Sequence, residues 1–252
     1  MYKKFRVFPL LLAFSLFVTA LSSCGKTAVG DSEKIIEKAK KKTYKAEYIQ
    51  SENFSKEYKT GDGVVSYVLS VTYPVLSDEA PLTVKQSINS LMQYRLELYQ
   101  SDAQTNVENA AEYMKNNSTS TPWSMNVTYK IEFVSDTFLS FTLDEKYSTA
   151  GKDVSPSTIA FNYNLSTGEQ VDAREFIPFS SNEDEVLSAV KQHIKTRLKT
   201  EKSYLADEDT LNKMTEGIFD KGRFLINNDF VTFLVPVSRF NIGMYGTWRV
   251  EM

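Results

Sequence analysis

Apolar and polar residues alternate over long stretches of this sequence, which is the pattern of a strand with one buried face. One stretch places five apolar residues on the same face: Val65, Tyr67, Leu69, Val71 and Tyr73. Proline lacks the backbone donor that a sheet uses, so Pro74 is expected to end this strand. The alternation returns in residues 125–133, 139–143 and 159–165. One-sided strands are typical of antiparallel sheets, because the strands of parallel sheets are apolar on both faces.

Other parts of the sequence have the spacing of amphipathic helices, with apolar residues three or four positions apart. After Pro81, one stripe contains six apolar residues: Val84, Ile88, Leu91, Met92, Leu96 and Tyr99. Three further helices are expected: residues 107–115, 180–199 and 207–219. Hairpin turns are expected at Asp136 and at Asn227-Asn228. Strands and helices do not alternate regularly, so the sequence predicts an α+β fold of mainly antiparallel sheets packed by a few helices.

The first 24 residues have the three parts of a secretory signal. A basic start, residues 1–6, is followed by the apolar stretch 7–20 and by Leu-Ser-Ser-Cys at 21–24. The apolar stretch is shorter than the roughly 20 residues that span a bilayer. The ending resembles the lipobox of bacterial lipoproteins, and this resemblance implies cleavage before Cys24 and lipid attachment to its sulfur. The alternative is a plain secretory peptide that happens to contain a cysteine.

The expected lipid makes the membrane a partner and the cell envelope the expected location. Gly25 and Lys26 follow the cysteine, without the aspartate of an inner-membrane retention signal. The resemblance therefore does not indicate retention in the inner membrane. A lipid anchor in the cell envelope is expected, at the outer membrane with the protein on its periplasmic or surface-facing side, and the choice of membrane and face stays open. Residues 24–43 are polar and are expected to form a tether. Two small, closely joined α+β domains are expected to follow: residues 44–135 and 136–252.

Composition argues against several classes of function. Removal of residues 1–23 changes the formal charge from −3 to −6, and an acidic protein is a poor candidate for binding nucleic acid. The single cysteine excludes an intramolecular disulfide and a Cys-rich zinc site, and the single histidine, His193, excludes a pair of histidine ligands. The acidic groups at 183–185 and 207–209 lie where helices are expected to begin, and the helix dipole accounts for them. No metal, cofactor or catalytic residue is therefore expected.

The alternative to a binding protein is a cell-wall-active hydrolase that uses carboxylates. Three residues are its candidates: Asp153, Glu169 and Asp172. Four aromatic residues at expected strand ends or in loops are instead candidates for stacking on sugars: Trp123, Phe240, Tyr245 and Trp248. Core packing is the competing explanation for these aromatic residues, and their exposure decides between the two.

Three stretches resemble a bacterial envelope family of paired domains of unknown function. Residues 66–76, SYVLSVTYPVL, resemble the strand of its first domain, and residues 161–176, FNYNLSTGEQVDAREF, resemble the strand and Thr-Gly turn of its second. Residues 224–252 are similar to its closing hairpin. The family occurs in the extracytoplasmic part of the lysozyme-sensing anti-sigma factor RsiV and beside the peptidoglycan deacetylase PdaC. The family's Gly-Gly-Ala-His stretch is absent after Tyr147, so a role of that loop is not implied.

These observations together predict a lipid-anchored, non-enzymatic binding module of the cell envelope. The resemblance implies an envelope glycan, such as peptidoglycan, or a lysozyme-like protein as its ligand. A structural subunit of an envelope complex is a third possibility, which shares the anchor and needs no small-molecule site.

Overall fold

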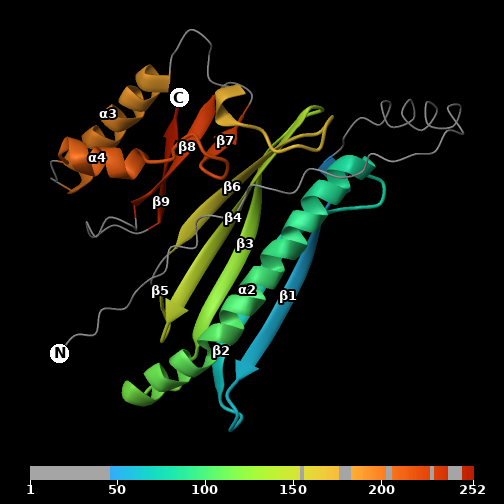
Figure 1. The fold of residues 1–252 in the computed structure, drawn as a ribbon, viewed down its shortest axis with the longest axis vertical. Helices are drawn as coiled ribbons and strands as arrows, with labels where there is room; N and C mark the ends of the chain where they lie inside the picture. The colour runs from blue at the N-terminus through green and yellow to red at the C-terminus, as the bar shows by residue number, and fades with distance from the viewer. Residues whose placement is uncertain (1–45, 154–155, 176–182, 203–205, 228–229, 238–245) are drawn as a thin grey trace, which may run out of the picture. The chain divides into compact units, whose positions relative to one another are not determined.

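The computed structural model describes residues 46–153, 156–175, 183–202, 206–227, 230–237 and 246–252 (Figure 1). All of them belong to one compact unit, Lys38–Met252. Within these residues the chain forms two mainly antiparallel sheets and three α-helices, which confirms the predicted α+β class. None of the described helices is both long and apolar enough to cross a membrane.

The first sheet contains six strands: β1 (Ile49–Lys59), β2 (Val65–Leu76), β3 (Trp123–Val134), β4 (Phe138–Thr149), β5 (Lys152–Asp153) and β6 (Ser157–Asn164). Their order is β1-β2-β3-β4-β5, and β6 also pairs with β4. The pairs are antiparallel except for β2 with β3, which are parallel. A parallel pair needs a long crossover, and helix α2 (Leu82–Asn116) supplies it. The turn at Asp136 joins β3 to β4, as the sequence predicts.

Helix α2 is one 35-residue helix, where the sequence predicts two shorter ones. Its buried stripe continues through Ala103, Val107 and Ala110. Ala103 and Ala110 are 0% exposed, because alanine lets the helix approach the sheet closely. The Ser66 hydroxyl of β2 donates to the Val107 carbonyl over 2.8 Å. The two predicted helices are therefore joined through Ala103, which does not stand out as part of an apolar stripe, and α2 runs along the strands (Figure 1).

Strand β2 continues through Pro74 to Leu76, so the prediction that Pro74 ends it is wrong. Pro74 lies opposite Ser51 of β1. On the other side, β3 pairs with β2 along Tyr67–Val71, so none of the described strands requires a donor from Pro74. A proline fits within a strand where its missing N–H faces no partner.

The second sheet contains three antiparallel strands: β7 (Phe224–Ile226), β8 (Val231–Pro236) and β9 (Thr247–Glu251). Helices α3 (Glu183–Lys202) and α4 (Glu208–Thr215) belong to the same part of the chain (Figure 1). Both begin with acidic residues, as predicted, and the Asp207 side chain caps α4 by accepting from the Thr210 N–H over 2.8 Å. Helix α4 is shorter than predicted, because the backbone leaves the helix at Glu216 and Gly217 has a φ of +65°. The predicted hairpin at Asn227 joins β7 to β8.

Two main groups of buried apolar side chains follow the two sheets. One draws its members from Tyr48–Leu165 and the other from Val171–Val250. The boundary predicted between residues 135 and 136 falls in the turn between β3 and β4, which pair along most of their length. The division into two domains stays a prediction, and the buried groups divide between residues 165 and 171.

Asn162 of β6 joins the two sheets through a buried set of hydrogen bonds. Its Nδ2 donates to the Phe224 carbonyl over 2.7 Å, and its Oδ1 accepts from the Ile226 N–H over 3.0 Å. The Ser140 hydroxyl donates to the same Oδ1 over 2.6 Å. Asn162 is 3% exposed and Ser140 is 0% exposed. The Asn162 amide thus makes the hydrogen bonds to the backbone of β7 that a neighbouring strand would otherwise make.

A second link between the sheets is an ion pair. Arg249 of β9 donates to Glu132 of β3 over 2.5 Å, and Lys130 donates to the other carboxylate oxygen over 2.8 Å. Burial alone would raise the pKa of Glu132, but the bonds from these two cations outweigh it and lower the pKa. Glu132 therefore stays ionised in the folded protein to a lower pH than an ordinary glutamate.

This ion pair predicts an acid-dependent contribution to stability. A carboxyl whose pKa is lower in the folded state stabilises the protein above its unfolded pKa, and this is lost as the pH falls through the folded pKa. We expect Glu132→Gln to be less stable than wild type at pH 7, with the difference shrinking below about pH 4. Urea unfolding between pH 7 and 3 measures it, with Glu201→Gln as a surface control. A difference that stays constant with pH would contradict the prediction.

Candidate functional site

Four aromatic side chains from four neighbouring strands form a row across one face of the first sheet. The aromatic row consists of Tyr58, Tyr67, Trp123 and Tyr147. The registers place Tyr58 beside Tyr67, and Tyr67 beside Trp123. Ring centroids lie 6.4 Å apart for Tyr58 and Tyr67, 6.3 Å for Tyr67 and Tyr147, and 5.8 Å for Trp123 and Tyr147. Tyr113 of α2 packs edge-on against Trp123, with 5.6 Å between centroids.

The aromatic row changes from buried to accessible along its length. Tyr67 is 0% exposed and Tyr58 is 3% exposed, so these two rings belong to the core. Trp123, Tyr147 and Tyr113 are half-buried. The accessible end of the row is therefore the part made by β3, β4 and α2, and a ligand would meet Trp123 there.

Three polar atoms of the aromatic row are buried without a hydrogen-bond partner among the described residues. They are the hydroxyls of Tyr58 and Tyr67 and the indole Nε1 of Trp123. Burial and the nearby Asp102 carboxylate raise the pKa of Tyr67, so its hydroxyl stays protonated and can donate. A buried polar group without a partner costs about 1–3 kcal/mol. The two hydroxyls lie in the core, and the Trp123 Nε1 is the one of the three that belongs to a half-buried ring.

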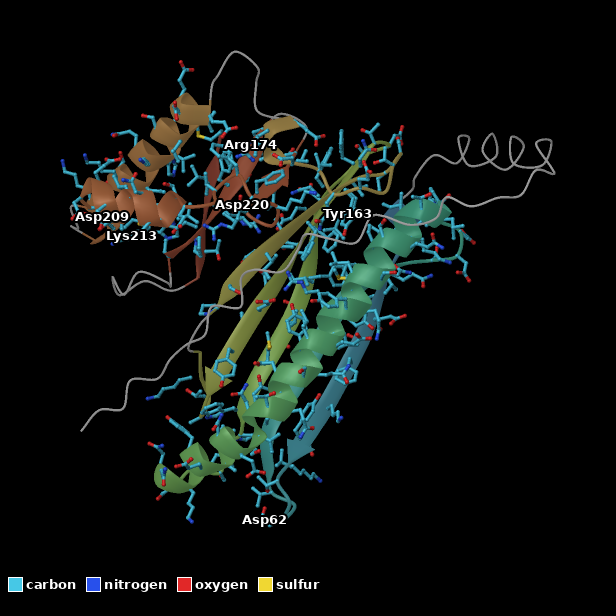
Figure 2. The ribbon with its side chains drawn as sticks, viewed as in Figure 1. Asp62, Tyr163, Arg174, Asp209, Lys213 and Asp220 are labelled. Carbon is cyan, nitrogen blue, oxygen red and sulfur yellow. The ribbon has the colours of Figure 1, made fainter. Side chains whose placement is uncertain are left out.

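A cavity of about 970 Å³ lies at the same end of the sheet, between the β1–β2 turn and the end of α2. This hairpin cavity is lined by Thr60, Gly61, Asp62, Val64, Val65, Glu108, Ala111, Glu112, Met114, Lys115, Ser118, Thr119 and Ser120. Asp62 lies at the tip of the turn (Figure 2). A hydrogen bond from Thr60 lowers the pKa of Asp62, so this carboxylate stays ionised and makes this side of the cavity polar. Val65 and Met114 in the lining are close in sequence to Tyr67 and Tyr113, but no residue of the aromatic row lines the cavity itself.

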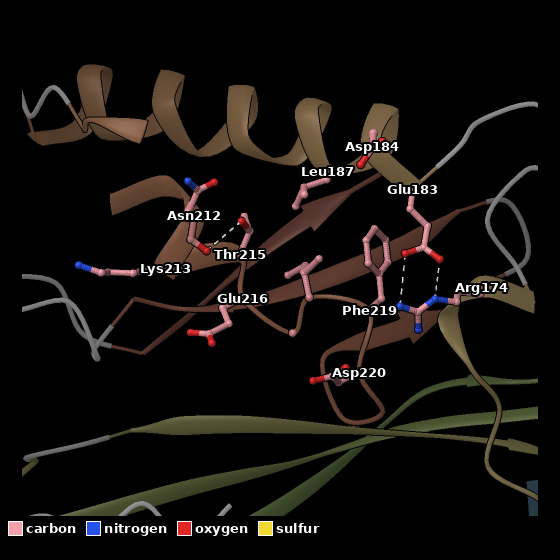
Figure 3. A pocket seen from close by; sticks show the side chains of 12 residues that line it. Arg174, Glu183, Asp184, Leu187, Asn212, Lys213, Thr215, Glu216, Phe219 and Asp220 are labelled. Atoms are coloured by element: carbon pink, nitrogen blue, oxygen red, sulfur yellow. Dashed lines mark hydrogen bonds and ion pairs between the residues drawn. The ribbon is translucent and has the colours of Figure 1, made fainter. Parts of the chain in front are cut away.

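Another cavity, of about 570 Å³, lies beside α4 in the second part of the chain (Figure 3). Three of its charged lining residues, Arg174, Glu183 and Lys213, form ion pairs within the protein. Arg174 donates to Glu183 over 2.6 Å and to Asp172 over 3.4 Å, and its guanidinium lies 5.4 Å from the Phe219 ring centroid.

The aromatic residues that the sequence proposes for stacking on sugars do not lie together in the structure. Trp123 belongs to the aromatic row. Trp248 of β9 is 8% exposed in the second buried group, and the Arg197 guanidinium lies 4.2 Å from its ring centroid. The two tryptophans therefore do not share a surface patch. Phe240, Tyr245 and Cys24 lie outside the described residues.

The carboxylates expected of a hydrolase lie in two places: Asp153 is opposite Ser148 of β4, the neighbour of Tyr147, and Glu169 and Asp172 follow β6. Asp153 is in the short strand β5, Glu169 is exposed, and Asp172 pairs with Arg174. His193 is exposed on α3. Among the described residues, no group of three or more histidine, cysteine, aspartate or glutamate side chains could hold a metal ion.

The sequence pattern does not indicate that the tyrosines of the aromatic row or the nearby Asp102 belong to a site. It places Tyr67 on a buried strand face but does not identify the residues beside it on the neighbouring strands. The signal lies in the pairing, because Tyr58, Tyr67 and Trp123 meet only when the β1–β2 and β2–β3 registers are fixed.

Comparisons with known proteins identify similar folds. No family model matches the sequence, and no curated protein matches it. A solved structure of a DUF3298 family member from Bacteroides fragilis matches with a TM-score of 0.50 and 16% identity, over 81% of this chain and 89% of that chain. A DUF3298 family protein from Pseudomonas aeruginosa has a TM-score of 0.46 and 13% identity, over 81% and 89%. The fold is therefore similar to that of a DUF3298 protein, a domain of unknown function.

Proposed function

We propose that the protein is a lipid-anchored, non-enzymatic binding protein of the bacterial cell envelope, and that its ligand is an envelope glycan. The observation that carries the glycan is the aromatic row, with its half-buried Trp123, whose indole Nε1 has no hydrogen-bond partner among the described residues. Aromatic faces stack on sugar rings, and hydroxyl and acetamido oxygens of a glycan accept hydrogen bonds from such donors.

The resemblance to the RsiV and PdaC family supports an extracytoplasmic location, and the Leu-Ser-Ser-Cys ending supports the anchor. On this proposal Cys24 carries the lipid, and the tether holds the folded part away from the membrane. Each buried methylene of an acyl chain contributes about 0.8 kcal/mol, so two or three chains give stable attachment.

The anchor is tested by replacing Cys24 with serine. Wild-type protein is expected to incorporate labelled palmitate and to sediment with membranes. Cys24→Ser is expected to incorporate none and to leave the membrane fraction almost completely. A variant that still sediments, or a wild-type protein without label, would refute lipid attachment.

The ligand is tested with soluble peptidoglycan fragments in titration calorimetry. Trp123→Ala is expected to weaken binding about tenfold, or about 1.4 kcal/mol, because it removes a stacking face and a donor together. Tyr94→Ala is the matched control, since Tyr94 is 47% exposed on α2 and does not belong to the aromatic row.

The same experiment separates a glycan from a protein ligand. Binding to a lysozyme, with no response to the fragments, would replace the glycan by a lysozyme-like protein. Equal affinity of wild type and Trp123→Ala for the fragments would remove the aromatic row as the site.

A further inference from the structure

Strand β1 is an open edge of the first sheet. It is 11 residues long, and within the described residues it pairs only with β2. Its residues Ser51, Asn53, Ser55 and Glu57 are exposed. Long open edges invite pairing with another strand, and proteins usually shorten them, break them with proline or place charged side chains, especially lysine, on them. β1 is long and contains no proline.

The hydrogen bonds of β1 show which backbone groups face the open edge. The Ser77 N–H donates to the Tyr48 carbonyl over 2.9 Å, so Tyr48 faces β2. Backbone direction alternates along an antiparallel strand, so Glu52, Phe54 and Lys56 also face β2. Ser51, Asn53, Ser55 and Glu57 therefore present their N–H and carbonyl groups outward. Pro74 opposite Ser51 agrees with this, since no donor is needed there.

The charges of β1 are complementary to those of a second copy of itself. Phe54 is the middle residue of the strand, and antiparallel pairing about Phe54 brings the whole of Ile49–Lys59 into register with its copy. Glu52 of each copy then lies opposite Lys56 of the other, on the same face of the sheet. Opposite charges in such positions stabilise a pair of strands.

Antiparallel pairing about any of the neighbouring residues of β1 does not place Glu52 opposite Lys56. A centre at Glu52 or at Lys56 places like charges opposite each other, which destabilises the pair. A centre at Asn53 or Ser55 places one of the charged side chains opposite Phe54. Pairing about Phe54 combines the longest overlap with two ion pairs and no like-charge pair.

We propose that the protein forms a homodimer by antiparallel pairing of two β1 strands about Phe54, which joins the two first sheets into one. The occupant of the edge is a second copy of this chain, because the charge pattern of β1 complements its own reverse. This interface shares Tyr58 of β1 with the aromatic row but does not include Trp123, and it holds whether or not the ligand is a glycan.

The experiment uses two differently tagged copies of the full chain, expressed in one cell and solubilised in mild detergent. The measured quantity is the amount of the second tag that co-purifies with the first. Wild-type copies are expected to co-purify. Glu52→Lys and Lys56→Glu, each present in both copies, are expected to lower this amount by roughly tenfold, because each makes two like-charge pairs.

The charge-exchanged variant Glu52→Lys/Lys56→Glu decides between the interface and misfolding. It restores both ion pairs with their signs reversed, so co-purification is expected to return to near the wild-type amount. Lys146→Glu, an exposed reversal on β4, is the control and should have no effect. Absence of wild-type co-purification, insensitivity to the single reversals, or failure of the double variant to restore it would each overturn the proposal.

Discussion

Replacement of Asn162 by leucine is expected to lower the free energy of unfolding by about 3–5 kcal/mol. The leucine leaves three buried groups without their partner: the Phe224 carbonyl, the Ile226 N–H and the Ser140 hydroxyl. Ile226 keeps a longer bond of 3.3 Å to Ser140, so its loss is partial. Denaturant unfolding followed by circular dichroism measures the change.

Asn164 provides a control on the same strand. Its Oδ1 accepts from the Ser166 and Thr167 N–H groups in an exposed turn, where water can replace it. Asn164→Ala is therefore expected to cost about 1 kcal/mol. Equal losses of unfolding free energy for the two substitutions would show that the buried hydrogen bonds of Asn162 stabilise the protein no more than the exposed ones of Asn164.

Phe141→Ala is expected to cost about 3–5 kcal/mol, since it empties space in the middle of the first buried group. Phe141 is 0% exposed and stacks on Phe161 with 5.0 Å between ring centroids and 20° between planes. Tyr163 lies on a parallel plane 6.3 Å away. The unfolding midpoint in urea measures the loss.

Phe141→Leu is the matched comparison for this position. It keeps most of the volume and loses the ring stacking, so it is expected to cost less than half as much as alanine. A loss from Phe141→Ala under about 1 kcal/mol would mean that the aromatic stack is not part of the stabilising core.

Much of the first sheet could be predicted from the sequence, because alternation over five positions leaves little choice of face. The β3 and β4 strands and the turn at Asp136 follow from this pattern alone. The end of β2 could not be predicted, because the effect of Pro74 depends on which strands lie beside it. The continuity of α2 was hidden for a related reason, since Ala103 and Ala110 matter only through their closeness to the sheet.

Trp123 is the one residue of the candidate site that the sequence predicts as a binding residue. The tyrosines of the aromatic row are spread over residues 58–147, and only strand pairing brings them together. Asn162 likewise has no sequence signal, because its partners Phe224 and Ile226 lie about 60 residues away and contribute backbone atoms.

The parallel pairing of β2 with β3 is short and covers only Tyr67–Val71 and Trp123–Val127. On either side, antiparallel neighbours form between strands close in sequence. The sheet therefore consists of two antiparallel parts, one containing β1 and β2 and the other containing β3 and β4, which are joined by the short parallel pairing of β2 with β3. Amide hydrogen exchange of these residues measures the stability of that pairing. Tyr67 and Trp123 are register partners in this parallel pairing, so a ligand that binds Trp123 is expected to slow amide hydrogen exchange between β2 and β3.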